Sequence, residues 1–161
     1  MRDIIFLDTT LRDGDQAAGY ALPLASKVYL AQKLAECKID VIEAGFPMSS
    51  HNEYIACREI AAVLAGTGST IALMCRGVEK EIRETAEILS KNNSLLHISL
   101  PVSNEHIQSK FRISPAKFLL HAEKLTRYAT NYASQIECGA EDATRSDFNF
   151  LRDYCETVIG A

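Results

Sequence analysis

The sequence predicts an α/β fold built from about five successive βα units with parallel strands. One observation is a series of short apolar runs, each about as long as a buried strand: IIFL (4–7), VIEAG (41–45), TIALMC (70–75), LLHISL (95–100) and QIECGA (135–140). The other is that the segments between these runs place apolar residues at helical spacing. Strands that alternate with helices, and that are apolar without a clean period of two, favour a parallel sheet covered on both faces.

Each run is followed by a helical segment with one apolar stripe. The stripes are Leu24, Val28, Ala31 and Leu34; Ile60, Val63 and Leu64; Val78, Ile82, Ala86 and Leu89; Phe118, Ala122, Leu125 and Ala129; and Phe148, Leu151, Cys155 and Val158. Ser114 and Pro115 precede the fourth stripe as an N-cap and first helical residue. No linker or low-complexity segment separates the units, so we expect one domain over residues 1–161.

Two parallel α/β architectures fit this alternation. An open doubly wound sheet can be complete with five strands, whereas a (β/α)₈ barrel typically needs about 250 residues. The length of 161 residues by itself favours the open sheet.

The composition is that of a soluble globular protein, with 47% hydrophobic and 24% charged residues and a net charge of −4. No basic run is present, so neither nucleic acid nor an anionic membrane is an expected partner. No segment resembles a signal peptide or a membrane span, so we expect a cytoplasmic protein. The five cysteines form no CxxC pair, which predicts reduced, mostly buried thiols rather than a zinc site.

Polar residues collect where the predicted strands end. The first run leads into DTTLRDGDQAAG (8–19), Glu43 and His97 lie inside two later runs, and Glu141 follows the fifth. In a parallel α/β fold these strand ends share one face, where ligands bind. Each residue taken alone has an ordinary structural explanation, such as a turn for Asp13 or a satisfied core position for His97. Their joint placement at one rim is what indicates a site.

The residue types at this rim suit carbonyl chemistry. Carboxylates can hold a divalent cation, and a metal can polarise a carbonyl group and hold a 2-oxo acid. A neighbouring arginine can stabilise a developing oxyanion, and a further carboxylate can act as a base or proton relay. Arg12, Asp13, Glu43 and Glu141 together therefore indicate the making or breaking of a C–C bond next to a carbonyl.

Several segments in order resemble the 2-isopropylmalate synthase branch of the DRE-TIM metallolyases. They are LDTTLRDGDQ, EAGFPMSS, RGVEKEI, LLHISLPVSNEHIQSKFRIS and IECGAEDATRSDFNFL. The resemblance runs from about Ile4 to the C-terminus and implies a (β/α)₈ barrel, which overrides the argument from length. Residues 1–161 would then be a partial TIM barrel of about five βα units, without the remaining barrel and without a C-terminal regulatory domain.

The resemblance also implies a reaction and roles for residues. The family condenses acetyl-CoA with a 2-oxo acid, here 2-oxoisovalerate in leucine biosynthesis, with the help of Mn²⁺, Mg²⁺ or Zn²⁺. By position, Asp13 would bind the metal, Arg12 and Glu141 would be catalytic, and the substrate-binding residues would be Gln16, Glu43 and His97. Homocitrate synthase and citramalate synthase are alternatives within the same chemistry.

Two departures from the family pattern bear on activity. The family's further metal ligands form a His-x-His pair, whereas the histidines here are His51, His97, His106 and His121, no two of them two residues apart. Gly139 also stands where the family often has serine. We therefore expect this chain alone to be inactive, or else to be a non-catalytic truncated barrel that serves as a binding or assembly module. Open sheet edges favour self-association, so a homo-oligomer is expected.

Overall fold

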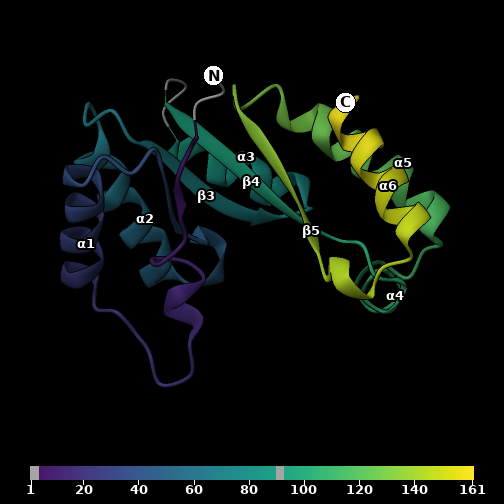
Figure 1. Ribbon diagram of the computed structural model, residues 1–161, viewed down its shortest axis with the longest axis horizontal. Helices are drawn as coiled ribbons and strands as arrows, with labels where there is room; N and C mark the ends of the chain where they lie inside the picture. The colour runs from purple at the N-terminus through teal and green to yellow at the C-terminus, as the bar shows by residue number, and fades with distance from the viewer. Residues whose placement is uncertain (1–3, 90–92) are drawn as a thin grey trace.

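The computed structural model describes residues 4–89 and 93–161, and within them one parallel sheet with its strands in sequential order. The strands are β1 (Leu7–Asp8), β2 (Val41–Gly45), β3 (Thr70–Arg76), β4 (Ser94–Pro101) and β5 (Ile136–Glu141). Figure 1 shows that the sheet twists strongly from β1 to β5. A doubly wound sheet would reverse its strand order at the first strand. The open sheet favoured by chain length is therefore wrong, and the partial barrel is confirmed.

Six helices of the described chain accompany the strands. They are α1 (Leu24–Glu36), α2 (His51–Leu64), α3 (Glu79–Ile88), α4 (Asn104–Phe111), α5 (Pro115–Ala129) and α6 (Phe148–Ile159). Five of them match the predicted stripes, and the side chain of Ser114 caps α5 as expected by accepting the N–H of Lys117. The additional helix is α4, which is short and is capped by Ser103. In Figure 1, α1 and α2 lie beside one end of the sheet and α5 and α6 beside the other.

In the part of the chain that the structure describes, helices cover one face of the sheet and not the other. Along β4, Leu96, Ile98 and Leu100 are fully buried, whereas His97 and Ser99 between them are only partly buried. The buried set packs in one core with residues of the helices such as Phe118. The expectation of a sheet covered on both faces is therefore wrong, because a curled sheet turns its second face toward the barrel axis. That inner face is where His97 lies.

The first apolar run differs most from its prediction. Strand β1 has only two residues, and Ile4, Ile5, Phe6 and Leu7 are 79%, 70%, 63% and 46% exposed. The reason is positional, since β1 is at the edge of the sheet and pairs with β2 alone among the described strands. An edge strand has neighbours on one side only, so its apolar side chains stay in contact with solvent.

The cysteines follow the prediction in part. Cys57 and Cys75 are buried and Cys138 is half-buried, but Cys37 and Cys155 are exposed, and all five are free thiols. Burial raises the pKa of Cys75 to about 12, so this thiol stays protonated at neutral pH. Cys37 is exposed because it lies at the end of α1, after the last helical turn.

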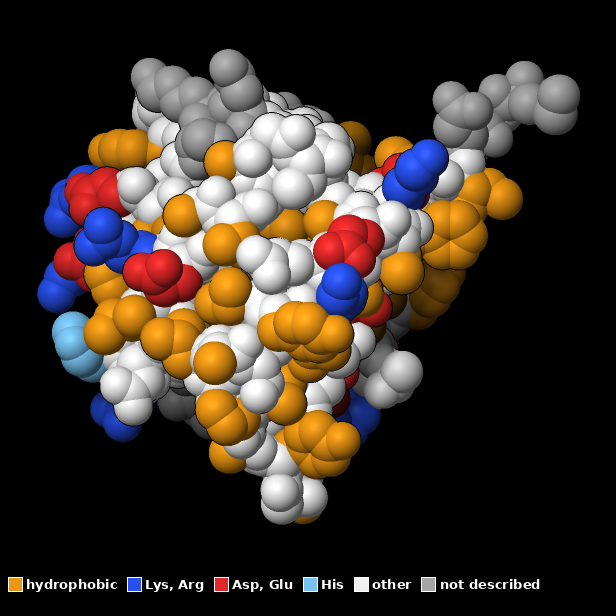
Figure 2. Space-filling model, turned by 90° about the vertical axis from the view of Figure 1, so that its left-hand side faces the viewer, with side chains coloured by type: hydrophobic (Ala, Val, Ile, Leu, Met, Phe, Trp, Pro, Cys, Tyr) orange, Lys and Arg blue, Asp and Glu red, His pale blue; other side chains and the backbone are white. Residues whose placement is uncertain are grey.

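The outer surface mixes its charges. On the face in Figure 2, which is the left-hand side of Figure 1, acidic and basic side chains lie among apolar ones and form no large area of one sign. No helix within residues 4–89 and 93–161 is both long and apolar enough to span a bilayer.

A matched pair of truncations tests the different burial of two phenylalanines. Phe118→Ala removes a fully buried ring and should lower the free energy of unfolding by about 3–5 kcal/mol. Phe6→Ala removes an exposed ring and should change it by no more than about 0.5 kcal/mol. Urea denaturation followed by circular dichroism measures both, and a large loss in Phe6→Ala would contradict the exposed position of the first run.

Candidate functional site

The loop after β1 forms a tight turn that presents Arg12 to the sheet. The carbonyl oxygen of Thr9 accepts the backbone N–H groups of Arg12, Asp13 and Gly14 at 3.1, 2.8 and 3.1 Å. Leu11 is fully buried and anchors the turn in the core. With Leu11 pointing into the core, the adjacent Arg12 side chain extends toward β2.

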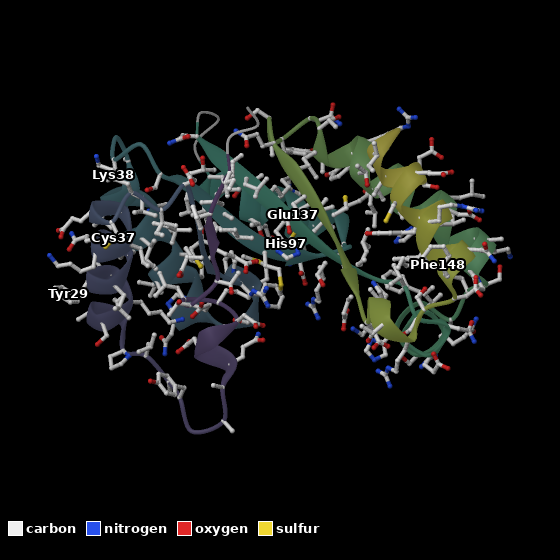
Figure 3. The ribbon with its side chains drawn as sticks, in the orientation of Figure 1. Tyr29, Cys37, Lys38, His97, Glu137 and Phe148 are labelled. Carbon is white, nitrogen blue, oxygen red and sulfur yellow. The ribbon has the colours of Figure 1, made fainter. Side chains whose placement is uncertain are left out.

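Arg12, Glu43 and His97 form one connected group. The Nε of Arg12 donates to Oε2 of Glu43 at 2.8 Å, and Nδ1 of His97 lies 2.6 Å from Oε1 of the same carboxyl group. Glu43 is 1% exposed on β2, and a register irregularity against β3 lies between Glu43 and Gly45. Figure 3 shows His97 at the centre of the sheet beside Glu137, its register partner on β5. The fold thus joins groups from three separate βα units.

The two partners decide the charge of Glu43. Burial opposes its ionisation, but the hydrogen bonds from His97 and Arg12 outweigh burial and lower the pKa of this carboxyl group. Glu43 is therefore a carboxylate at neutral pH and can only accept hydrogen bonds. Nδ1 of His97 therefore donates its proton to this hydrogen bond with Glu43.

A cavity of about 880 Å³ opens beside this group at the carboxyl ends of the strands. Its polar lining comes from several different βα units: Arg12, Gln16, Arg76, Glu81, Ser99, Lys110 and Glu141. The structure therefore brings Arg12, Gln16 and Glu141 together as predicted. Glu43 and His97 are outside this lining and connect to it through Arg12.

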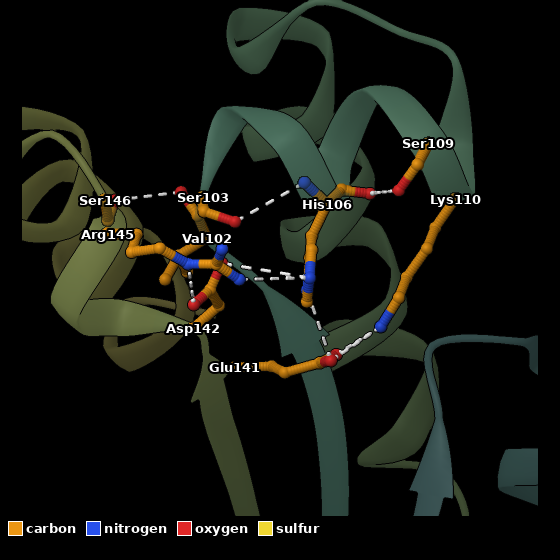
Figure 4. A network of polar contacts seen from close by, with 9 residues as sticks. All are labelled: Val102, Ser103, His106, Ser109, Lys110, Glu141, Asp142, Arg145 and Ser146. Carbon is orange, nitrogen blue, oxygen red and sulfur yellow. Dashed lines mark hydrogen bonds and ion pairs between the residues drawn. The ribbon is translucent and has the colours of Figure 1, made fainter.

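Glu141 belongs to a second polar network, which sequence analysis did not foresee (Figure 4). The ammonium group of Lys110 contacts both carboxylate oxygens of Glu141 at 2.6 and 2.7 Å, and Nδ1 of His106 lies 3.3 Å from one of them. Arg145 pairs with the neighbouring Asp142 at 2.7 Å. Lys110 and His106 are four residues apart on α4, a spacing that places side chains on one helix face. That spacing was the available signal, but α4 itself was not recognised.

Asp13 by itself supplies little of a metal site. Its side chain is 66% exposed and contacts Nη1 of Arg12 at 3.0 Å. Across the part of the chain that the structure describes, no three His, Cys, Asp or Glu side chains are grouped as metal ligands. A single exposed carboxylate already paired with arginine does not match the six or so oxygen ligands that hard divalent cations take. The described residues therefore do not fit a complete metal centre.

Known proteins resemble this chain in sequence. The sequence matches the HMGL-like family over residues 3–161. It is 43% identical over 161 residues to 2-isopropylmalate synthase of Pyrococcus furiosus and 39% identical over 163 residues to that of Nitrosospira multiformis. These matches cover 99% and 100% of this chain but 32% of each relative, so the chain spans about a third of their length.

A solved structure agrees on the fold. HMG-CoA lyase from Brucella melitensis superposes with a TM-score of 0.74 at 15% identity, over 99% of this chain and 58% of that one. At this identity the likeness concerns the fold alone. The family match and the 2-isopropylmalate synthase relatives confirm the resemblance carried by the strand-end motifs, and the chain belongs to the HMGL-like family.

Proposed function

We propose that this chain is the N-terminal portion of the catalytic barrel of a synthase that joins acetyl-CoA to 2-oxoisovalerate, giving 2-isopropylmalate. The observation that carries the proposal is the Arg12–Glu43–His97 group beside a cavity that also holds Gln16 and Glu141. The 2-isopropylmalate synthase relatives support the same reaction class. A cytoplasmic location and a homo-oligomeric assembly stay predictions.

A Claisen condensation needs two kinds of group from the protein. A base removes a proton from the acetyl methyl group, and the resulting carbon attacks the ketone carbon of the 2-oxo acid, whose oxygen becomes negative. A cationic donor must stabilise that oxygen. Water then hydrolyses the thioester and releases CoA.

Arg12 suits the role of the cationic donor. Its Nε is used on Glu43 and its Nη1 on Asp13, so these two bonds occupy two of its five N–H donors. The remaining N–H groups are available for a carboxylate or ketone oxygen in the cavity. Because Glu43 is buried and ionised, it fixes the guanidinium plane before substrate binds, and such preorganisation lowers the reorganisation cost of the reaction.

Glu141 suits the role of proton acceptor or relay, because its carboxylate lines the cavity and is held by the ammonium group of Lys110. Gln16 would contribute amide hydrogen bonds to the 2-oxo acid. A divalent cation, which the family relationship implies, would use Asp13 as one ligand, but the described residues do not complete its site.

The His97 ring is set by Gly139 on the neighbouring strand. A Cβ atom built at Gly139 would lie 2.6 Å from Nε2 of His97, closer than real Cβ contacts allow. The absence of a side chain at this position therefore lets the ring reach Glu43 on one side and leave Nε2 facing β5. The serine that the family often has at this position would compete with the ring for the same space.

A chimera tests the proposed reaction. The part of the Pyrococcus furiosus synthase that aligns with this chain is replaced by residues 1–161, and release of the CoA thiol is measured with acetyl-CoA and a 2-oxo acid. We expect release with 2-oxoisovalerate above that with 2-oxoglutarate or pyruvate, the substrates of homocitrate and citramalate synthesis. Arg12→Lys should lower the rate about 10²–10³-fold. A folded chimera that releases no thiol with any of the three acids would contradict the proposal.

The single carboxylate at Asp13 predicts weak metal binding by this chain alone. Titration with Mn²⁺ followed by electron paramagnetic resonance should give a Kd of about 1 mM or weaker, because tight sites need several carboxylate ligands. Asp13→Asn should change that value little. Micromolar binding that is lost in Asp13→Asn would mean that the described residues do form a metal site.

Gly139→Ala tests how His97 is positioned. The new methyl group should displace the ring from Glu43, which changes the ¹⁵N shifts of the His97 imidazole and lowers stability by about 1–3 kcal/mol. Gly14→Ala is the matched control, because a Cβ there meets Thr10 at an ordinary 3.7 Å. Unchanged His97 shifts in Gly139→Ala would show that the ring does not depend on the glycine.

A further inference from the structure

Lys27, in the first turns of α1, is a buried lysine outside the cavity. It is 3% exposed, and its ammonium group contacts Oδ2 of Asp15 at 2.8 Å and Oε2 of Glu53 at 2.6 Å. Lysine is almost never fully buried unless it is paired. Here one cation is shared between two carboxylates that come from different parts of the chain.

The first carboxylate belongs to the loop that carries the candidate site. Asp15 lies between Asp13 and Gln16, and its second oxygen accepts the backbone N–H of Leu22 at 2.8 Å. The Asp15 side chain therefore joins the two ends of the segment 15–22 and also connects this segment to α1. Arg12, three residues before Asp15, is attached to the sheet independently through Glu43.

The second carboxylate links the cluster to β2 and α2. Glu53 is in the first turn of α2, where its backbone N–H also donates to the Ser50 side chain. A Cβ atom at Gly45, the last residue of β2, would collide with the Glu53 carboxylate. The glycine thus leaves the room in which Glu53 reaches Lys27, and the cation joins the loop to two βα units.

Few other contacts hold this part of the loop. Asp13, Gln16 and the residues from Ala17 to Ala21 are exposed. Without the ammonium group, Asp15 and Glu53 would be two carboxylates that face one small space and repel each other, while burial penalises both. The least costly relief is for the loop to move Asp15 outward, since α2 is fixed by its packing in the core.

We propose that Lys27 is a positioning residue for the candidate site: it ties the loop that carries Arg12, Asp13 and Gln16 to α1 and α2. The inference rests on the proposed function only for what this loop binds. Its structural part concerns the loop in this chain, whatever reaction the cavity serves. Lys27 itself contacts neither the cavity lining nor the Arg12–Glu43–His97 group.

Lys27→Met tests the proposal, with Lys33→Met as the matched control on the same helix. Both variants remove an ammonium group and keep an unbranched side chain, but Lys33 is half exposed, pairs with Glu36 at 2.7 Å and lies over the Tyr29 ring. Backbone amide hydrogen exchange is followed at Gln16, Ala17 and Leu22 of the loop, and at Ile98 of β4 as a measure of the core. We expect exchange in the loop to rise about tenfold or more in Lys27→Met relative to Ile98, and not in Lys33→Met.

Two further measurements separate positioning from a merely structural role. The Nε–H resonance of Arg12 should shift in Lys27→Met because the loop that carries it moves, and Lys27→Arg should restore both this signal and the protection of the loop. Asp15→Asn, which keeps an oxygen for the Leu22 N–H, should loosen the loop in the same way. Equal loss of protection in loop and core would overturn the proposal, as would global unfolding of both Lys27→Met and Asp15→Asn. None of these readouts depends on acetyl-CoA chemistry, so failure of the proposed reaction would leave them unchanged.

Discussion

The ionised carboxylate of Glu43 is the interaction on which the mouth of this partial barrel depends. It is buried on β2, and it is kept charged by hydrogen bonds from Arg12 and His97. A buried charge is costly unless it is paired and hydrogen-bonded. If either Arg12 or His97 were removed, the one remaining hydrogen bond would have to offset the free-energy cost of burying the Glu43 charge. The three residues therefore fix one another, and with them the positions of the β1 loop and of β4.

Two groups of buried ion pairs hold the loop after β1. Glu43 holds Arg12 from the inner face of the sheet, and Lys27 holds Asp15 from the helix side. Between these anchors lies Asp13, which is exposed. A short polar loop has too little apolar surface to order itself by burial, so charge-assisted hydrogen bonds supply the fixed geometry that a binding loop needs. The glycines at 45 and 139 serve the same end, since each leaves space for a charged or polar side chain to reach its partner.

The strands at the two edges of the sheet are less buried than the strands in its middle. Strands β2 to β4 have neighbours on both sides and bury their outward residues under helices, whereas β1 is short and β5 is only half-buried along its whole length. Glu141, at the end of β5, is held by α4, because Lys110 reaches it from that helix. The site is thus held by paired strands near β2 and β4 and by a helix contact near β5.

The sequence by itself determined the strand–helix alternation, four of the five strands, the cap of α5 and the family, because periodicity and local capping act over a few residues and the strand-end motifs are contiguous. It also pointed to Arg12, Glu43, His97 and Glu141, since these polar residues lie within or directly after the predicted strands of one parallel sheet. Tertiary structure alone decided which of these residues touch: Arg12 and His97 meet on Glu43, and Glu141 turns to Lys110. It also decided that IIFL is exposed and that Lys27 is buried. Both outcomes depend on which residues lie nearby in space. The local sequence around IIFL or around Lys27 does not specify those neighbours.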